Sequence, residues 1–430
     1  MIEEQKFNYG KLFVIGFGFF GVSVLWSLYN TYVPILLNTT FGLDTIAVGF
    51  FMSLDNIAAL FIQPAVGAWS DRVRTKLGRR LPFILVGAPI AAVAFGLIPL
   101  AKSLPIFVAC TVTTILSMAF WRTPVVALMP DVTPSRFRSQ ANGIINFMGG
   151  LGLVLGTSIG AILVKQGIVY PFWFGSILVL LAAALVLLFV REPKTYEDNP
   201  NNEKPDLWKS LKDLVKSRHG DAIRIFLAIF FWFIAYNAIE AFLSLYGIHH
   251  LGLDESGAGN LITSVGFSFL LFAIPAGFIG GKFGRKLTIS TGLVIMIAVL
   301  LSVHFIPTDV LLHEYTSLPV LGKIMNLTFL LLAAGIGWAC ININSLPVVV
   351  DLTDSSQIGT FTGLYYLFST LAAIAGPNIN GWIVKLTGDN YSSIFIIGPI
   401  FMLAALIMIM TMNEVKPKSP DKEILEVPQE

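Results

Sequence analysis

Charged residues are scarce in this sequence: Asp, Glu, Lys and Arg together make up only 13% of its 430 residues. A soluble chain usually carries about 25% charged residues, which it needs to cover its surface. Hydrophobic residues reach 55%, so much of the surface must face a solvent that tolerates uncharged side chains, and lipid is such a solvent. The net charge of +2 argues against a nucleic-acid partner, which would need a basic surface.

Cysteine is almost absent as well. The two cysteines, Cys110 and Cys340, lie inside apolar runs, where a thiol behaves as a small buried hydrophobic group. We therefore expect neither a disulfide nor a metal site from them. His249 and His250 have no third ligand near them in the sequence, and we find no nucleophile motif or acidic cluster. The sequence thus predicts no metal, no cofactor and no enzymatic activity.

Long apolar runs, in contrast, are abundant. A helix needs about 20 mostly apolar residues to cross the hydrocarbon core of a bilayer. This criterion predicts an all-α integral membrane protein with twelve spans, near residues 11–37, 45–69, 81–101, 104–130, 138–164, 169–190, 225–247, 257–281, 286–306, 322–349, 357–385 and 392–412.

Basic residues are concentrated on one side of the predicted membrane. The loops of that side hold Arg72, Arg74, Lys76, Arg79, Arg80, Arg136, Arg138, Lys282, Arg285 and Lys286. The opposite side holds only Lys102, Lys165, Lys323 and Lys385. Because Lys and Arg are retained in the cytoplasm, we expect a multi-pass protein of the cell membrane with both termini cytoplasmic. An even number of spans agrees with that expectation.

The two halves of the sequence resemble one another in parallel order. Four short segments recur at a spacing close to half the chain: residues 29–30 with 236–237, 41–44 with 251–254, 64 with 275, and 78–80 with 284–286. Two six-span halves in parallel repeat are typical of the major facilitator architecture, in which the substrate site lies at mid-membrane between the halves. We therefore predict an N-terminal six-helix bundle at 1–190, a cytoplasmic linker at 191–224, a C-terminal six-helix bundle at 225–412 and a cytoplasmic tail at 413–430.

The loop after the second span resembles the signature loop of major facilitator transporters. That signature reads G-x-x-x-D, a short gap, then G-R-[RK], and its positions are filled here by Gly67, Asp71 and residues 78–80. The gap is longer than usual, and Pro-Phe-Ile follows at residues 82–84. Both features resemble the signature loop of the sucrose-type branch, the glycoside–cation symporters. The resemblance implies a sugar or glycoside as the solute and a proton as the coupling cation.

The fourth span carries the same resemblance. Arg122 precedes Asp131, and Ala-Asn-Gly follows at residues 141–143, as in that branch. The branch reads roughly P-x-R-A-L-x-A-D, whereas here the prolines lie between the arginine and the aspartate. This departure concerns the shape of the site more than its charge.

In the family, the signature loop clasps the cytoplasmic face when the transporter opens outward. Arginine pairs with carboxylates and with the carbonyl ends of helices. We therefore expect Asp71, Arg79 and Arg80 to form a conformational latch, and not to bind the solute. A purely topological role would explain the positive charge but neither Asp71 nor the glycines.

Three ionisable residues, Asp55, Arg122 and Glu240, lie deep inside predicted spans. A charge at the bilayer centre costs about 2.5–3.5 kcal/mol on insertion scales, so each one calls for a function. The Arg122 guanidinium can grip sugar hydroxyls or a carboxylate at two points, and we expect it to bind the solute; an internal ion pair with Asp55 or Glu240 is the alternative. We expect Asp55 and Glu240 to couple the cation, either a proton or sodium held by several oxygens.

Aromatic and amide residues complete the predicted solute site. Sugars present C–H faces to aromatic rings and hydroxyls to amides, so we expect the solute to contact Tyr29, Asn30, Asn237, Trp338 and Asn342 as well as Arg122. The amides could instead join helices by hydrogen bonds, and the aromatic residues could face lipid.

The sequence therefore predicts a monomeric secondary transporter that takes up a sugar or glycoside together with a proton. The alternatives are an uncoupled or sodium-coupled transporter, an exporter of another small polar solute, and a membrane sensor without transport. The fifth span lacks the Gly-Pro element that drug–proton antiporters usually carry, which argues against drug efflux.

Overall fold

The computed structural model describes residues 9–133, 138–192, 220–353 and 357–412. Most of the predicted linker and the tail at 413–430 lie outside these residues. Within the described part, twelve helices are long and apolar enough to cross a membrane, which confirms the predicted number of spans.

Six of these helices come from each half of the chain. The first six are α1 (Tyr9–Ile35), α2 (Thr45–Arg72), α3 (Leu81–Leu97), α4 (Leu104–Val132), α5 (Arg138–Leu163) and α6 (Val169–Phe189). The second six are α8 (Gly220–His249), α9 (Glu255–Phe283), α10 (Arg285–Phe305), α12 (Asn326–Asp351), α13 (Ile358–Leu386) and α14 (Ile394–Met410). Short helical turns extend or join them at Leu36–Thr40, Ile98–Leu100, Val164–Gln166, Thr308–Leu311 (α11) and Tyr391–Ser393.

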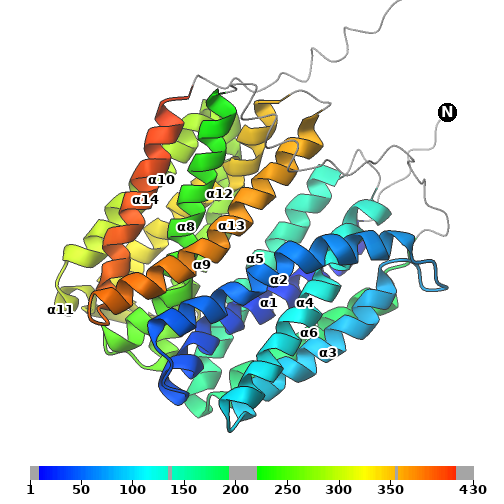
Figure 1. Ribbon diagram of the computed structural model, residues 1–430, viewed down its shortest axis with the longest axis horizontal. Coiled ribbons are helices and arrows are strands. Elements are labelled where there is room, and N and C mark those ends of the chain that lie inside the picture. The colour runs from blue at the N-terminus through cyan, green and yellow to red at the C-terminus, as the bar shows by residue number, and fades with distance from the viewer. Residues whose placement is uncertain (1–8, 134–137, 193–219, 354–356, 413–430) are drawn as a thin grey trace, which may run out of the picture.

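Each set of six helices packs mainly within itself. The first set is held together by pairs such as α1–α5 and α3–α4, and the second by pairs such as α9–α12 and α8–α13. The two sets meet where α2 packs on α13, α5 on α9 and α1 on α8, and Figure 1 shows them side by side. We call these sets the first half and the second half.

The start of the second long helix in each half is built in the same way. Gly42 and Gly252 adopt left-handed conformations with φ of 65° and 67°, which glycine tolerates without steric cost. Two residues later, Asp44 and Asp254 each accept a hydrogen bond from the backbone N–H three residues on, at 2.9 and 2.7 Å. Such N-caps satisfy a backbone donor that the helix leaves without a partner. The sequence similarity at 41–44 and 251–254 therefore encodes one shared turn and cap.

A small β-hairpin departs from the predicted all-α structure. Strands β1 (Glu314–Leu318) and β2 (Gly322–Met325) pair antiparallel between α10 and α12. The tenth span was expected to begin near residue 322, whereas α12 begins at Asn326. The strands are only five and four residues long, too short for a clear alternating pattern to distinguish them from the apolar start of a helix.

Helices α2 and α13 join the two halves near the beginning of α2. Thr45 Oγ1 donates a hydrogen bond to the carbonyl of Gly381, and Asn378 Nδ2 donates one to Ser53 Oγ, both at 2.9 Å. Between these contacts, a side chain at Gly49 would collide with the backbone of α13. Beyond them the two helices diverge toward the end of α2 and the start of α13 (Figure 1). The contact between Asn378 and Ser53 lies next to Pro377 and Met52, which line the cavity described next.

Candidate functional site

A polar cavity lies between the two halves, next to the crossing of α2 and α13. Its volume is about 110 Å³, and α1, α2, α8 and α13 supply its lining residues Asn30, Met52, Asp55, Asn56, Asn237, Glu240, Ala241, Ala373 and Pro377. Four of these residues (Asn30, Asp55, Asn237 and Glu240) are among those predicted from the sequence. The cavity thus combines two carboxyl groups and three amides at membrane depth.

One hydrogen bond across this cavity joins the halves directly. Asn30 Nδ2 on α1 donates to Glu240 Oε1 on α8 at 3.3 Å. Asn237 lies on the same face of α8 as Glu240, because residues three apart are neighbours on a helix, and its Nδ2 donates to the Phe233 carbonyl at 2.7 Å. The side-chain oxygen of Asn237 is therefore available to a ligand as an acceptor.

Asp55 occupies the α2 wall of the cavity. Its Oδ1 accepts a hydrogen bond from Asn56 Nδ2 at 2.9 Å, and its charge interacts with those of Arg122 and Glu240. Attraction to the arginine and repulsion by the glutamate act together on this carboxyl group. Binding of a cation at either carboxyl would therefore affect the other.

Arg122 lies on α4 and does not line this cavity. The residue keeps accessible surface, although it belongs to a candidate membrane span and its guanidinium lies deep among protein atoms. Its charge interacts with Asp55 and Tyr366, yet no described carboxylate lies within 4 Å of it. The direct ion pair with Asp55 or Glu240 that the sequence left open is not formed in this conformation.

Three residues predicted to contact the solute lie elsewhere. Tyr29 is fully buried and packs edge-on against Trp26 at 5.4 Å between ring centroids. Trp338 is 4% exposed and stacks on Tyr236 at 3.8 Å. Asn342 is on α12 outside the cavity, and its carbonyl accepts a hydrogen bond from a serine one turn on. Trp338 therefore supports Tyr236, which is next to the cavity residue Asn237.

The asparagines of α13 were not among the residues predicted from the sequence. Asn378 bonds to Ser53 on α2, and Asn380 Nδ2 donates to the Ala238 carbonyl on α8 at 3.0 Å. These amides lie in an otherwise apolar span beside Pro377, which lines the cavity. Two asparagines next to a proline in such a span are the signal that could have identified this wall.

The predicted latch residues form a network inside the first half. Arg79 and Arg80 both pair with Asp131 at the end of α4, with Nε to Oδ2 distances of 2.9 Å each, and Arg80 also pairs with Asp71 at the end of α2. Glu192, after α6, accepts hydrogen bonds from the backbone N–H groups of residues 79, 80 and 81 at 2.7–2.8 Å. The network therefore ties together α2, α3, α4 and the end of α6.

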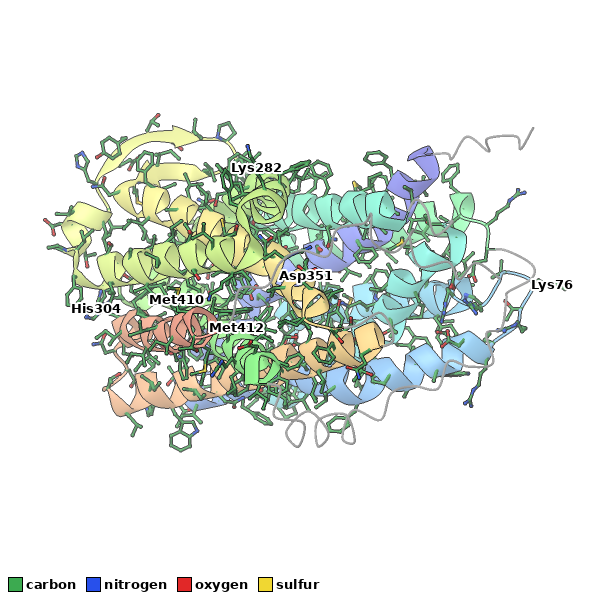
Figure 2. All side chains as sticks on the ribbon, turned by 90° about the horizontal axis from the view of Figure 1, so that it is seen from above. Lys76, Lys282, His304, Asp351, Met410 and Met412 are labelled. Atoms are coloured by element: carbon green, nitrogen blue, oxygen red, sulfur yellow. The ribbon has the colours of Figure 1, made fainter. Side chains whose placement is uncertain are left out.

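The second half has a smaller counterpart of this network. Arg285, at the start of α10, pairs with Asp351 at the end of α12 at 2.6 Å. Asp351 lies near the middle of the molecule in Figure 2, whereas Lys76, in the loop after α2, lies at its far end. The described contacts of both networks stay within their own halves.

A bound metal has no evident site in the described part of the chain. No group of three or more His, Cys, Asp or Glu side chains there could hold a metal ion.

Comparison with known proteins gives the family. A sequence model of the Major Facilitator Superfamily matches residues 15–258 and 248–429. Multidrug resistance protein 2 of Bacillus subtilis (strain 168) is 23% identical over 425 residues, covering 96% of this chain and 97% of that protein. The solved structure of a mutant of the nucleoside transporter NupG superposes with a TM-score of 0.72 at 15% identity, covering 94% of this chain and 99% of that chain, which shows a common fold.

The resemblance to the sucrose-type branch is local. Sucrose transport protein SUT4 of Oryza sativa subsp. indica is 30% identical over 164 residues, which cover 33% of this chain and 27% of that protein. A relative that matches along almost the whole chain is instead named for drug resistance, so the expectation against drug efflux gains no support. The fold, the twelve spans and the family match together identify a multi-pass membrane transporter and not an enzyme. This chain belongs to the Major Facilitator Superfamily.

Proposed function

We propose that this chain is a cation-coupled secondary transporter that moves a small polar solute through the cavity between its halves. The observation that carries the proposal is the hydrogen bond from Asn30 to Glu240. It joins helices of different halves, and its acceptor is an ionisable group. A cation that binds Glu240 changes this bond, and therefore changes the contact between the two parts that must move.

Asp55 supplies the second coupling group. Two carboxyl groups that repel one another favour a bound proton, or a sodium ion held between their oxygens. Asn30, Asn56 and Asn237 add amide oxygens and donors to the same space. A solute that hydrogen-bonds with these amides would compete with the contacts that hold the halves together, which is how binding can be linked to movement.

The basic loops favour one orientation of the chain in the membrane. We place the loop at residues 73–80 in the cytoplasm because of its excess of Lys and Arg. The crossing of α2 and α13 then closes the outer side, and the helices diverge toward the cytoplasm (Figure 1). Asp71, Arg79 and Arg80 hold the first half rigid in this state, and we propose that they contact the second half when the cytoplasmic side closes.

Export of a small solute is the favoured direction, because a relative that matches along almost the full length is named as a multidrug resistance protein. Uptake of a sugar or glycoside is the second candidate. It is supported by the three amides of the cavity and by the local match to sucrose transport proteins.

Transport by purified protein in liposomes tests the proposal. We would screen labelled sugars and labelled drugs with proton and sodium gradients of either sign. A saturable, gradient-driven flux that Glu240→Gln abolishes supports the proposal. Glu255→Gln is the matched control, because Glu255 is a half-buried carboxyl at the start of α9 that does not line the cavity. An unchanged gradient response in Glu240→Gln would overturn the coupling role.

A further inference from the structure

A second pocket opens beside the polar cavity, inside the second half. We propose that it receives an apolar group of the transported solute, so that the solute is amphipathic, with a small polar head and a short apolar tail. The inference rests on the proposed transport function and specifies the substrate class of that site. It is carried by Glu240, which lines both the polar cavity and this pocket.

The walls of the pocket are apolar. Five helices of the second half line it through residues such as Leu243 on α8, Ile262 on α9, Met296 on α10, Ala334 on α12 and Phe395 on α14. All of these side chains are buried. Among the described residues that line it, only Tyr236 and Glu240 carry oxygen atoms in their side chains. Its volume of about 60 Å³ suits a short alkyl group and not a large ring system.

Glu240 joins the pocket to the polar cavity. It lines both spaces, one beside Asn30, Asp55 and Asn237, the other beside Leu243 and Ile262. Tyr236, one turn earlier on α8, also lines the apolar pocket, and its ring is fixed by stacking on Trp338 at an interplanar angle of 6°. A solute whose head contacts Glu240 therefore has an apolar space next to that head.

A leucine of the first half closes one side of the pocket. Among the described residues that line the pocket, Leu153 on α5 alone does not come from the second half. It packs into the space left by the missing side chain of Gly266 on α9, where a Cβ atom would collide with the leucine. Because Leu153 and Gly266 belong to different halves, relative movement of the halves withdraws the leucine. Access to the pocket thus changes together with the conformation of the transporter.

The energetics favour an apolar occupant. A pocket lined by aliphatic side chains gives water few hydrogen bonds, and such cavities bind apolar ligands. Burial of one methylene group from water tightens binding about four-fold. A tail of a few carbons would therefore raise affinity steeply until the pocket is full, and longer tails would add nothing.

Two homologous series test the inference. Methyl to hexyl members of the n-alkyltrimethylammonium and n-alkyl glucoside series would be titrated calorimetrically against the full chain in lipid nanodiscs. Empty nanodiscs correct for partition of the tails into lipid. We expect binding in at least one series to tighten about four-fold per methylene and then to level off. A dissociation constant that does not depend on chain length in either series would overturn the inference.

Variants locate the tail. Ala334→Phe fills the pocket and should remove the dependence on chain length, whereas Ala333→Phe on the same helix, outside the pocket, should retain it. Leu331→Ala enlarges the pocket, so affinity should level off at longer tails than in the wild type. This second variant keeps the test decisive if Ala334→Phe impairs folding. Equal chain-length dependence in Ala334→Phe and the wild type would overturn the inference. If the wild type binds the series with the expected chain-length dependence but shows no gradient-driven flux, the proposed function alone would be overturned.

Discussion

Asn30 on α1 donates a hydrogen bond to Glu240 on α8, with 3.3 Å between Nδ2 and Oε1, and this bond spans the boundary between the two halves. Both residues line the polar cavity. A bond between an amide and an ionised carboxylate is stronger than one between neutral groups. The charge state of Glu240 therefore acts on the stability of this conformation, which is closed where α2 crosses α13.

Removal of the donor should weaken that closed state. Hydrogen bonds to charged groups contribute about 1.5–3 kcal/mol, so Asn30→Ala should shift the balance between outward-open and inward-open states by at least about ten-fold. Labelling of single cysteines placed near Thr45 would measure this shift. Asn342→Ala is the control, since Asn342 lies outside the cavity. Equal labelling in both variants would contradict the role of the bond.

Arg122→Gln should abolish transport while leaving the fold intact. The residue keeps accessible surface, and no described carboxylate pairs with it within 4 Å, so its loss removes no ion pair. We expect at least a hundred-fold drop in solute flux with a melting temperature within about 2 °C of the wild type. Arg285→Gln breaks an ion pair with Asp351 and should lower the melting temperature. Normal flux in Arg122→Gln would remove this residue from the solute pathway.

Asp131→Asn should destabilise the first half. The carboxylate of Asp131 is 10% exposed and pairs with Arg79 and Arg80, whose side chains are 15% and 5% exposed. Loss of one partner from a buried ion pair costs about 3–5 kcal/mol, and we expect the lower end because both arginines keep other contacts. Asp71→Asn should cost less, since Asp71 is 51% exposed. Thermal unfolding in detergent would rank the two variants, and the reverse order would contradict the network.

Gly49→Val should prevent the outer side from closing. Helices α2 and α13 approach so closely at Gly49 that a side chain would meet the backbone around Pro377. We expect the variant to favour the outward-open state and to lose transport. At Gly67, farther along α2, an added Cβ would make only ordinary contact with Thr123 at 3.5 Å. Gly67→Ala should therefore behave like the wild type, and a similar loss in both variants would argue for general misfolding.

The sequence predicted the fold more fully than the site. Apolar runs and basic loops are properties of whole segments, so twelve spans could be read without knowing how the helices face one another. Asp55 and Glu240 could also be identified, because a charge in a span is costly wherever it points. The family match extends along the chain, whereas the match to sucrose transport proteins covers about a third of it, which is why the branch could not be assigned.

Which face of each helix points toward the cavity could not be predicted. Tyr29 and Asn30 are neighbours in sequence, yet a helix turns about 100° between them, and only the asparagine reaches the cavity. Trp338 was expected at the solute but stacks on Tyr236. The β-hairpin between α10 and α12 was missed because its short strands give no periodic signal.

Solute-driven proton movement tests the central proposal most directly. Liposomes containing the wild-type protein and an internal pH dye would receive a transported solute without an imposed gradient. We predict a saturable pH change in the wild type, and its absence in Glu240→Gln and Asp55→Asn. Solute flux in these variants should also lose its dependence on pH. A pH change of equal size in the wild type and both variants would contradict coupling through this cavity.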